Sequence, residues 1–352
     1  MRNQLHEKQN IELAHGLRGK RVMVSGATGL IGSRVVFRLL ELNEKESAGV
    51  LIIALYRDKG KKDRIFCNLS KREDIAFIQC DLEKNNLDLP QADYIIHCAG
   101  VSGGSKLRMT DPLKVFHAGI GGTAFMLDFA VKHDCKGFLF ASSYEIYGES
   151  SSNTLISENH SSTLDLFVLR NCYAEVKRCC ESLLCAYHAT YNLPVFAARL
   201  TSTFGAGVAY DDPRFFAEFA RCILEEKNIV LKSTGSTIRS YLDADDAATA
   251  FLYILLRGES NNAYNLTNME NAISIRGIAK KMIEISGKSI QIEFSIAADA
   301  HKLGMRKEST TLLDATKLQA LGWKPVHTLE ETISALLASI RETRSLKGDN
   351  DK

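Results

Sequence analysis

Residues 21–33 constrain the fold of this chain more than any other stretch, because they join a predicted strand, a tight turn and the start of a helix. They read Arg-Val-Met-Val-Ser-Gly-Ala-Thr-Gly-Leu-Ile-Gly-Ser. The apolar run 22–24 is typical of a parallel strand that is covered on both faces. Gly26 then allows the backbone to turn where a side chain would clash, and the apolar pattern of residues 30–42 predicts a helix.

Three glycines in this stretch, Gly26, Gly29 and Gly32, indicate a dinucleotide-binding turn. In such a turn one glycine leaves room for the pyrophosphate, and another lets the helix pack closely on the strand. The N-terminal amides and the dipole of the helix favour a phosphate at this point. The context supports the interpretation, since the motif follows an apolar strand and a second apolar strand is predicted at 50–56.

Strands and helices alternate through the first part of the chain. Further strands are predicted at 76–80, 94–100, 137–143 and 195–200, and long helices at 111–133 and 171–191. This alternation predicts an α/β fold with a Rossmann-type doubly wound parallel sheet. Beyond Phe204 the pattern changes to helices near 214–226, 243–256, 274–285, 314–321 and 329–344, with short strands at 229–232 and 291–294.

This change of pattern predicts two domains. We expect an NAD-binding Rossmann domain of residues 20–204 plus about 238–266, and a smaller C-terminal α/β substrate domain of about 205–237 plus 267–344. Residues 1–19 form an N-terminal extension, either a packed helix or an ordered arm. The charged tail 345–352 is expected to be disordered.

The composition argues against several other classes of protein. Of the 352 residues 45% are hydrophobic and 24% charged, and the formal net charge is +2. This balance does not favour nucleic acid or a membrane surface as a partner, and no apolar stretch has the length of a transmembrane helix or the form of a signal peptide. Nine cysteines, an odd number, favour free thiols in a cytoplasmic protein, and we assign no metal site.

Tyr173 and Lys177 form the candidate catalytic pair. On a helix, residues four apart lie on one face. A tyrosine removes a proton from a hydroxyl group near neutral pH only if its anion is stabilised, and a lysine one turn away provides this stabilisation. The predicted strand 137–143 ends in Ser142 and Ser143 at the carboxyl edge of the sheet, where open parallel sheets bind ligands.

Taken in this order, the glycine motif, the serine-ended strand and the Tyr-x-x-x-Lys pair resemble the extended short-chain dehydrogenase/reductases, in particular the NAD-dependent epimerase/dehydratase family, which modifies nucleotide sugars. The resemblance extends over residues 20–344. Residues 198–205 resemble the Arg-x-x-Asn-x-Tyr-Gly-Pro element of the family, and 239–241 its Arg-Ser-Phe element. Two positions depart from the first element, because Ser202 replaces the asparagine and Ala206 the proline.

The resemblance implies NAD as the cofactor. The expected cofactor contacts are Gly26, Thr28, Gly29, Leu30, Ile31, Gly32, Arg57, Asp81, Leu82, Ala99, Gly100, Tyr173 and Lys177. The second strand ends in Tyr56 and Arg57 instead of the usual acidic residue, and Arg57 either stacks on the adenine or binds a 2′-phosphate, so NADP is not excluded. His97, at the end of the fourth strand, is interpreted as a hydrogen-bonded core histidine and not as a base.

The resemblance also implies a reaction. Ser143, Tyr173 and Lys177 would oxidise the C4 hydroxyl of a nucleotide sugar to a 4-keto intermediate, which is then epimerised or eliminated. Glu145 is either a base that acts beside the ketone, as a dehydratase or a decarboxylase requires, or a loop carboxylate. The expected substrate contacts are Ser143, Tyr144, Ser202, Tyr210, Arg214 and Arg239.

The sequence leaves two alternative functions open, and the resemblance also implies an oligomeric state. An NAD(P)-linked 4-keto-sugar reductase or dehydrogenase would exchange its cofactor in every cycle, and a non-catalytic dinucleotide-binding regulator would use the same fold without chemistry. The intact Ser143, Tyr173 and Lys177 argue against the regulator. By resemblance, the helices at 111–133 and 171–191 would pair across a two-fold axis, which predicts a homodimer with a four-helix interface.

Overall fold

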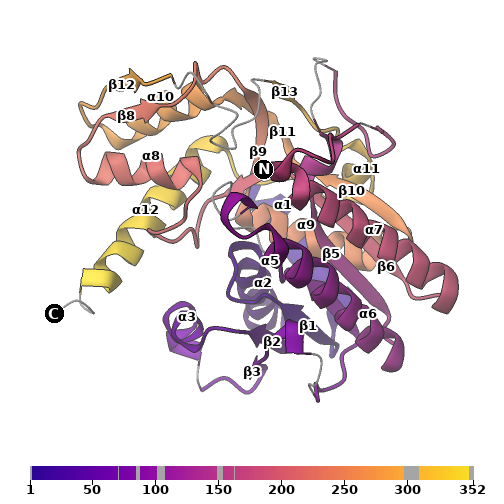
Figure 1. Cartoon of the computed structure of the whole chain (residues 1–352). Helices are drawn as coiled ribbons and strands as arrows, with labels where there is room; N and C mark the ends of the chain where they lie inside the picture. Colours follow the sequence, from indigo (N-terminus) through magenta and orange to yellow (C-terminus); the bar gives the residue numbers. More distant parts are fainter. Residues whose placement is uncertain are drawn as a thin grey trace.

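The computed structural model describes residues 2–69, 71–84, 88–100, 108–148, 154–161, 163–296 and 309–348. At its centre lies a parallel sheet of seven strands in the order β10-β6-β5-β4-β1-β2-β3 (Figure 1). The strands are β1 (Arg21–Ser25), β2 (Leu51–Tyr56), β3 (Ile75–Gln79), β4 (Tyr94–His97), β5 (Gly137–Ser143), β6 (Val195–Leu200) and β10 (Asn262–Leu266). The strand order reverses between β1 and β4, and in a doubly wound sheet the carboxyl ends at this reversal open into a ligand crevice. The predicted fold class is therefore confirmed.

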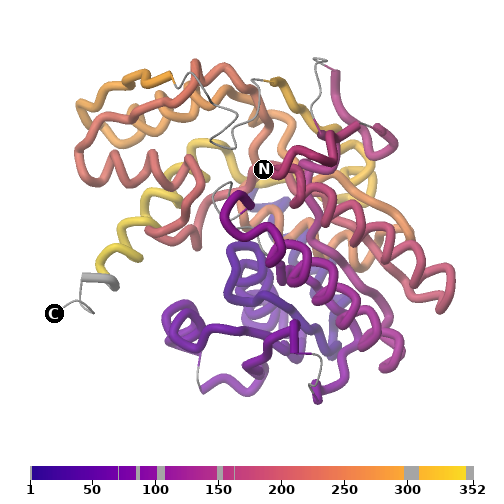
Figure 2. The backbone as a smooth tube through the Cα atoms, viewed as in Figure 1, coloured from indigo at the N-terminus to yellow at the C-terminus, as the bar shows by residue number. Residues whose placement is uncertain are grey.

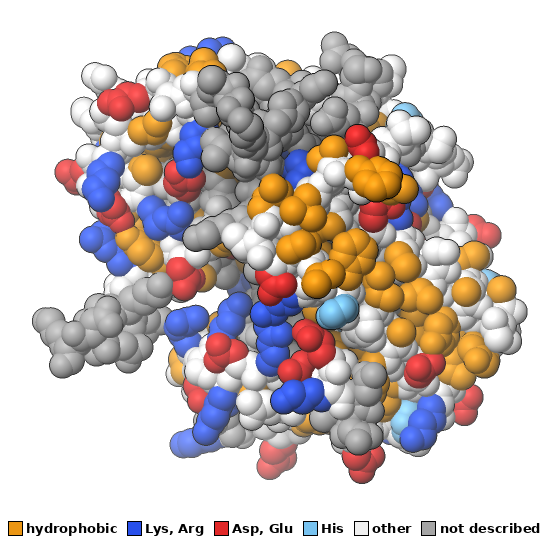
Figure 3. Space-filling view, viewed as in Figure 1, with side chains coloured by type: hydrophobic (Ala, Val, Ile, Leu, Met, Phe, Trp, Pro, Cys, Tyr) orange, Lys and Arg blue, Asp and Glu red, His pale blue; other side chains and the backbone are white. Residues whose placement is uncertain are grey.

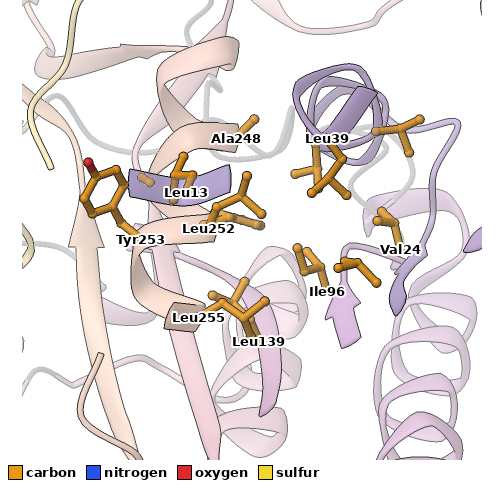
Figure 4. Close-up of a cluster of buried hydrophobic side chains, with 14 of the residues drawn as sticks. Leu13, Val24, Leu39, Ile96, Leu139, Ala248, Leu252, Tyr253 and Leu255 are labelled. Carbon is orange, nitrogen blue, oxygen red and sulfur yellow. The ribbon is translucent and has the colours of Figure 1, made fainter. Parts of the chain in front are cut away.

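Helices cover both faces of this sheet because the central strands are apolar on both sides. In β1, Val22 and Val24 face one hydrophobic cluster and Met23 faces another. The first cluster is closed by α1 (Arg2–Leu17), α2 (Leu30–Glu46) and α9 (Ala244–Arg257). Figure 4 shows the side chains of these helices meeting those of the strands, with Leu39 of α2 on the side of Ile96 and Leu255 of α9 beside Leu139 of the sheet.

The opposite face carries α5 (Pro112–Phe116), α6 (Gly122–Lys132) and α7 (Cys172–Tyr191). One π-helical segment, His117–Gly121, joins α5 to α6, so the predicted helix at 111–133 is present but contains an irregular turn. The remaining short helices are α3 (Lys59–Ile65) and the 3-10 turns η1 (Cys67–Leu69), η2 (Leu82–Lys84), η4 (Tyr144–Tyr147) and η5 (Leu169–Asn171). No helix within the described ranges is long and apolar enough to cross a lipid bilayer.

The rest of the described chain forms a second group of elements. In it β7 (Ser202–Phe204), β9 (Ile238–Asp243), β11 (Asn268–Ser274) and β13 (Thr310–Thr311) make a mixed sheet, and β8 (Ile229–Leu231) pairs with β12 (Ile292–Phe294). A third hydrophobic cluster lies among α8 (Phe215–Leu224), α10 (Ile275–Ser286) and α12 (Leu329–Gly348), while α11 (Thr316–Ala320) packs beside β10. Figure 2 shows the C-terminal helix α12, in yellow, lying beside α8, which is distant from it in sequence. Ile156 forms a parallel bridge with Leu313.

The structure corrects the expectation for the C-terminal tail. Helix α12 continues to Gly348, so residues 345–348 are helical where disorder was expected. The hydroxyl of Ser345 donates a hydrogen bond to the Arg341 carbonyl, and no proline or glycine interrupts the sequence of the helix before Gly348. Residues 349–352 lie outside the described residues.

The N-terminal extension is a packed helix, which decides between the two alternatives that the sequence left open. Leu13 and Leu17 of α1 are buried in the first cluster, and the carboxylate of Glu12 accepts a hydrogen bond of 2.6 Å from the Tyr253 hydroxyl on α9. The amide of Gln9 donates to the Lys324 carbonyl at 3.0 Å. Helix α1 is therefore part of the main core.

This packing predicts the effect of shortening one side chain of α1. Leu13→Ala should lower the free energy of unfolding by about 2–4 kcal/mol, because it removes a buried side chain and leaves a cavity. Ile11→Ala, on the exposed side of the same helix at 60% exposure, should change it by less than about 0.5 kcal/mol. Denaturant unfolding of both variants measures the difference, and equal effects would mean that α1 does not contribute to the core.

His327 and Asp246 connect the start of α9 to the segment before α12. Asp246 accepts hydrogen bonds from the amides of Val326 and His327 and from Nδ1 of His327, at 3.0–3.1 Å. Burial of the ring opposes its charged form, but the hydrogen bond to Asp246 and the nearby carboxylates outweigh it and raise the pKa of His327 to about 9. A folded pKa above the unfolded value stabilises the protein below about pH 6.5, and this contribution is lost as the pH rises through 9.

We therefore expect the cost of His327→Asn to depend on pH. At pH 6 the variant should lose about 1–2 kcal/mol of unfolding free energy relative to wild type, a value reduced for the partial exposure of the ring. Above about pH 9.5 most of that difference should disappear, because His327 is then neutral in both states. Denaturant unfolding at the two pH values measures this, with His15→Asn on the exposed side of α1 as control. A loss of unfolding free energy that does not depend on pH would refute a charged pair between His327 and Asp246.

Candidate active site

A cavity of about 1770 Å³ lies at the carboxyl ends of β1, β2, β4 and β5 and extends to α8, β9 and α12. It is named the central cavity. The predicted site residues that line it are Gly26, Thr28, Gly29, Leu30, Ile31, Gly32, Arg57, Asp81, Leu82, Ala99, Gly100, Ser143, Tyr144, Glu145, Tyr173, Lys177, Ser202, Arg214 and Arg239. The fold thus brings to one place residues that the sequence spreads over more than two hundred positions.

The glycine turn is built so tightly that two of its glycines admit no side chain. Gly26 has φ +65°, and a Cβ there would lie 2.7 Å from the Ala99 amide nitrogen. A Cβ on Gly32 would lie 2.3 Å from the Gly26 carbonyl oxygen. The lack of side chains at these two positions lets α2 lie close against the end of β1, and residues 29–34 at the start of that helix line the central cavity.

His97 lies beneath the glycine turn and joins the end of β1 to α6 by hydrogen bonds. Its Nδ1 lies 2.6 Å from the Ser25 hydroxyl and its Nε2 lies 3.2 Å from the Thr123 hydroxyl, with the ring fully buried. Burial and the charge of Lys177 lower the pKa of His97 to about 3, so the ring is neutral at physiological pH. The side chain therefore has the structural position expected from the sequence.

Tyr173 and Lys177 lie in the first turns of α7 and both face the central cavity. The Lys177 Nζ atom is 5.6 Å from the centroid of the Tyr173 ring, and it donates a hydrogen bond of 2.6 Å to the Ala141 carbonyl of β5. Lys177 is 9% exposed, so its ammonium acts where water screens it little. Ser143, at the end of β5, lines the same cavity and accepts a hydrogen bond from the Glu145 amide at 3.2 Å.

Arg108 is a cavity residue that the sequence did not reveal. Its Nη1 donates to Glu145 Oε2 at 2.7 Å, and the two side chains are 8% and 13% exposed. Its guanidinium carbon lies 4.1 Å from the centroid of the Tyr173 ring. Glu145 is therefore neither isolated nor a solvated loop carboxylate: it belongs to a buried ion pair that touches the candidate catalytic tyrosine.

The far end of the cavity is formed by residues of the second group of elements. The Arg239 guanidinium lies 5.4 Å from the Tyr144 ring centroid, and among the described residues its buried Nε has no hydrogen-bond partner. Ser202 lies in β7, and Arg214 is paired with Asp212 at 2.6 Å. Arg239 thus has a buried donor that no described residue satisfies.

Tyr210 differs from the expectation, because it does not line the central cavity. Its hydroxyl is hydrogen-bonded to Glu225, and its backbone amide donates to the Thr343 hydroxyl at 2.9 Å. These bonds tie the loop to α8 and α12. The structure brings Ser202, Arg214 and Arg239 to the cavity but not Tyr210.

Comparison with known proteins identifies the family of this chain. The profile of the NAD dependent epimerase/dehydratase family matches residues 22–267. The chain belongs to this family. UDP-glucuronic acid decarboxylase 2 of Arabidopsis thaliana is 26% identical over 92% of this chain and 69% of that protein.

Two solved structures of epimerases and dehydratases share the fold. UDP-glucose 4-epimerase of Thermotoga maritima, solved with UDP-glucose, has a TM-score of 0.78 at 21% identity and covers 92% of this chain and 99% of its own. dTDP-glucose 4,6-dehydratase of Bacillus anthracis str. Ames, solved in complex with NAD, has a TM-score of 0.77 at 18% identity and covers 93% and 98%.

This member of the NAD-dependent epimerase/dehydratase family takes NAD as its cofactor. Its glycine turn fits that group, because Gly29, the N-cap of α2, provides no side-chain cap and the first amides of the helix remain available for a pyrophosphate. Asp81 and Leu82 line the cavity beyond the end of β3, and Arg57 lies at its rim, 62% exposed and 3.8 Å from Glu83. Ala99 and Gly100 leave space beside Lys177, since a Cβ on Gly100 would lie 3.9 Å from Nζ.

Proposed function

We propose that the chain is an NAD-dependent nucleotide-sugar epimerase or dehydratase that oxidises the C4 hydroxyl of the sugar and then rearranges the 4-keto intermediate. One observation carries the proposal: Ser143, Tyr173 and Lys177 line the same cavity as the glycine turn. The activities named for the similar proteins, 4-epimerisation, 4,6-dehydration and decarboxylation of nucleotide sugars, support it. A nucleotide sugar has its sugar at Tyr173 and its diphosphate toward Arg239 in this proposal.

The chemistry at the protein side is a proton transfer. Tyr173, as its anion, accepts the proton of the C4 hydroxyl, Lys177 stabilises that anion, and Ser143 orients the reacting hydroxyl. When bound, NAD supplies the hydride acceptor that makes oxidation at C4 possible. The burial of Lys177 keeps its charge effective, since a water-filled site would screen it.

The alternative is a nucleotide-sugar decarboxylase, and the Arabidopsis relative supports it. All these activities share oxidation at C4 and differ in the fate of the 4-keto intermediate. A reductase that exchanges NADP is the second alternative, for which Arg57 at the cavity rim is the supporting residue. The intact catalytic residues argue against a non-catalytic regulator.

The first test is mass spectrometry of small molecules released when the purified protein is denatured. NAD or NADH near a 1:1 ratio to protein is the expected result, because a cofactor that is reduced and reoxidised in each cycle need not leave. Nuclear magnetic resonance of UDP-sugars incubated with the holoenzyme then shows a new C4 epimer, an eliminated product or released CO₂. Absence of any dinucleotide, or NADP in its place, would contradict the proposal and favour the exchanging reductase.

We also propose that the chain forms a homodimer through α6 and α7. Figure 3 shows hydrophobic side chains gathered over the region of α5, α6 and α7. The exposed positions of α7 include small uncharged residues that permit close helix packing, namely Cys179, Ser182, Cys185, Ala186 and Ala189. Phe167, just before α7, is 99% exposed, and Leu113 of α5 is 67% exposed. Apolar surface of this kind marks an interaction site.

The dimer predicts a specific effect of a charge on α7. Ala186→Glu should convert the dimer to a monomer in multi-angle light scattering, because it buries an unpaired carboxylate in the interface. Ile11→Glu, on the exposed side of α1, should leave the dimer intact. A wild-type monomer at micromolar concentration would refute the proposal.

Two further assignments belong to this proposal. We propose a division into two domains, with residues 20–204 and 238–266 holding NAD and residues 205–237 and 267–344 holding most of the substrate nucleotide. We also propose a cytoplasmic location, supported by the nine cysteines, all of which are described and free.

A further inference from the structure

Three cations lie near the rings of Tyr144 and Tyr173 in the central cavity. Arg108 and Lys177 lie 4.1 Å and 5.6 Å from the Tyr173 ring centroid, and Arg239 lies 5.4 Å from that of Tyr144. Within this group, the carboxylate of Glu145 opposes the three positive charges. In the proposed function Lys177 serves the tyrosine and Arg239 the diphosphate, which leaves Arg108 without a ligand to bind.

Arg108 is not saturated by the protein. A guanidinium has five N–H donors, and among the described residues only Nη1 of Arg108 has a hydrogen-bond partner, Glu145. Its Nε is buried and unpartnered, although the side chain lines the cavity at 8% exposure. Leaving buried donors of a charged group without acceptors is costly, so this arrangement is suited to an anionic acceptor from a ligand.

The position of Arg108 indicates which part of a sugar it would meet. Its guanidinium lies on the face of the Tyr173 ring, so a sugar whose C4 hydroxyl reaches Tyr173 has its neighbouring ring substituents beside Arg108. The C5 substituent of a hexose is a neutral hydroxymethyl group, and that of a hexuronic acid is a carboxylate. A planar guanidinium matches a carboxylate and gains little from a hydroxymethyl group.

We propose that Arg108 binds a carboxylate on the substrate sugar, and that the substrate is therefore a nucleotide-linked uronic acid. This rests on the proposed function, of which it names the substrate class; it leaves epimerisation and decarboxylation and excludes 4,6-dehydration, because a hexuronic acid has no C6 hydroxyl to eliminate. With the substrate bound, the sugar carboxylate would take donors of the Arg108 guanidinium that Glu145 does not use, because Nη1 is the Arg108 donor from which Glu145 accepts. Glu145 then competes with the substrate for the same guanidinium.

The test is calorimetric binding to the NAD-loaded protein. The probes are UDP, two neutral sugars (UDP-glucose and UDP-galactose) and two acidic ones (UDP-glucuronic acid and UDP-galacturonic acid). Wild type should bind the better acidic sugar at least about tenfold more tightly than its neutral counterpart. Arg108→Gln should bring this ratio close to one while leaving the affinity for UDP unchanged, and Arg108→Lys should keep part of the preference.

Two further variants separate ligand binding from a merely structural role. Glu145→Gln removes the competing carboxylate, so the preference for the acidic sugar should persist or increase. If Arg108 only held Glu145 in place, Arg108→Gln and Glu145→Gln would change this preference in the same way. The double variant Arg108→Gln/Glu145→Gln removes both charges of the ion pair, so it provides a folded protein even if Arg108→Gln is unstable. Arg64→Gln, an arginine that lines the cavity elsewhere, should keep the wild-type ratio.

The outcomes are distinguishable. Equal affinities of wild type for neutral and acidic sugars, with UDP bound, would overturn the role of Arg108 and leave the proposed function standing. A preference for acidic sugars that survives Arg108→Gln or the double variant would also overturn it. Failure to bind UDP, the four UDP-sugars and also dTDP-, GDP- and CDP-glucose would contradict the nucleotide-sugar function itself, and with it this inference.

Discussion

Tyr173→Phe is expected to lower kcat for the nucleotide-sugar reaction by about 10³-fold or more. General acid–base catalysis contributes about 10²–10⁴-fold, and the phenyl ring has no proton to exchange with the C4 hydroxyl. The ring itself stays, so its contact with the Arg108 guanidinium at 4.1 Å is preserved and the cavity keeps its shape. The measurements are turnover by nuclear magnetic resonance and the NAD content of the purified variant, which should equal that of wild type.

Tyr191→Phe is the matched control, since it makes the same change on the same helix at a side chain that is 57% exposed. It should retain wild-type turnover. If Tyr173→Phe kept more than about a tenth of the activity, Tyr173 would not be the group that exchanges the proton, and the catalytic assignment would have to move to another cavity residue.

The second large effect is expected at the glycine turn. Gly32→Ala places a methyl group 2.3 Å from the Gly26 carbonyl oxygen and 2.9 Å from the Gly26 carbonyl carbon. Because both contacts are with backbone atoms, the start of α2 must shift away from β1. We expect the NAD content of the purified protein to fall at least about tenfold, and the free energy of unfolding to fall by about 1–3 kcal/mol.

Gly121→Ala serves as the control, because a Cβ there meets nothing within 4 Å and its backbone is helical. That variant should retain its NAD and gain up to about 1 kcal/mol of stability. Mass spectrometry of the released dinucleotide and denaturant unfolding measure both variants. A Gly32→Ala protein that copurifies with NAD as wild type does would show that the close packing of α2 on β1 is not needed for cofactor binding.

The central sheet was predictable because its strands carry their signal locally. β5 and β6 begin and end where the sequence predicts them, at 137–143 and 195–200, since each opens with apolar residues that are buried on both faces. The glycine turn and the Tyr173–Lys177 pair were predictable for the same reason: each is a short motif whose spacing fixes its own geometry.

The strands that the sequence analysis did not predict depend on pairing with segments far along the chain. β9 was not predicted, and it is ordered by pairing with β7, β11 and β13, none of which was predicted either. β10 reads Asn-Ala-Tyr-Asn-Leu, without the β-branched run typical of a strand, and forms at the edge of the sheet by pairing with β6.

The ion pair of Arg108 with Glu145 was invisible for a similar reason, because the two residues are 37 positions apart and belong to no common motif. Tyr210 was expected to contact the substrate by resemblance; in the structure its hydroxyl is bonded to Glu225, a partner that no motif in the sequence indicated. Local sequence predicts what a motif does on its own, and not which distant charge will face it.

The docking of α1 has a consequence for the order in which a newly made chain gains structure. Glu12 is bonded to Tyr253, 241 residues later, and Gln9 to the carbonyl of Lys324, 315 residues later. During synthesis, α1 can therefore pack on α2 early, but α9 and the segment near Lys324, which complete its binding surface, are made much later. Domains fold as their segments emerge, so one face of the sheet stays incomplete until translation has passed residue 324. For that interval the nascent chain exposes the surface that chaperones bind.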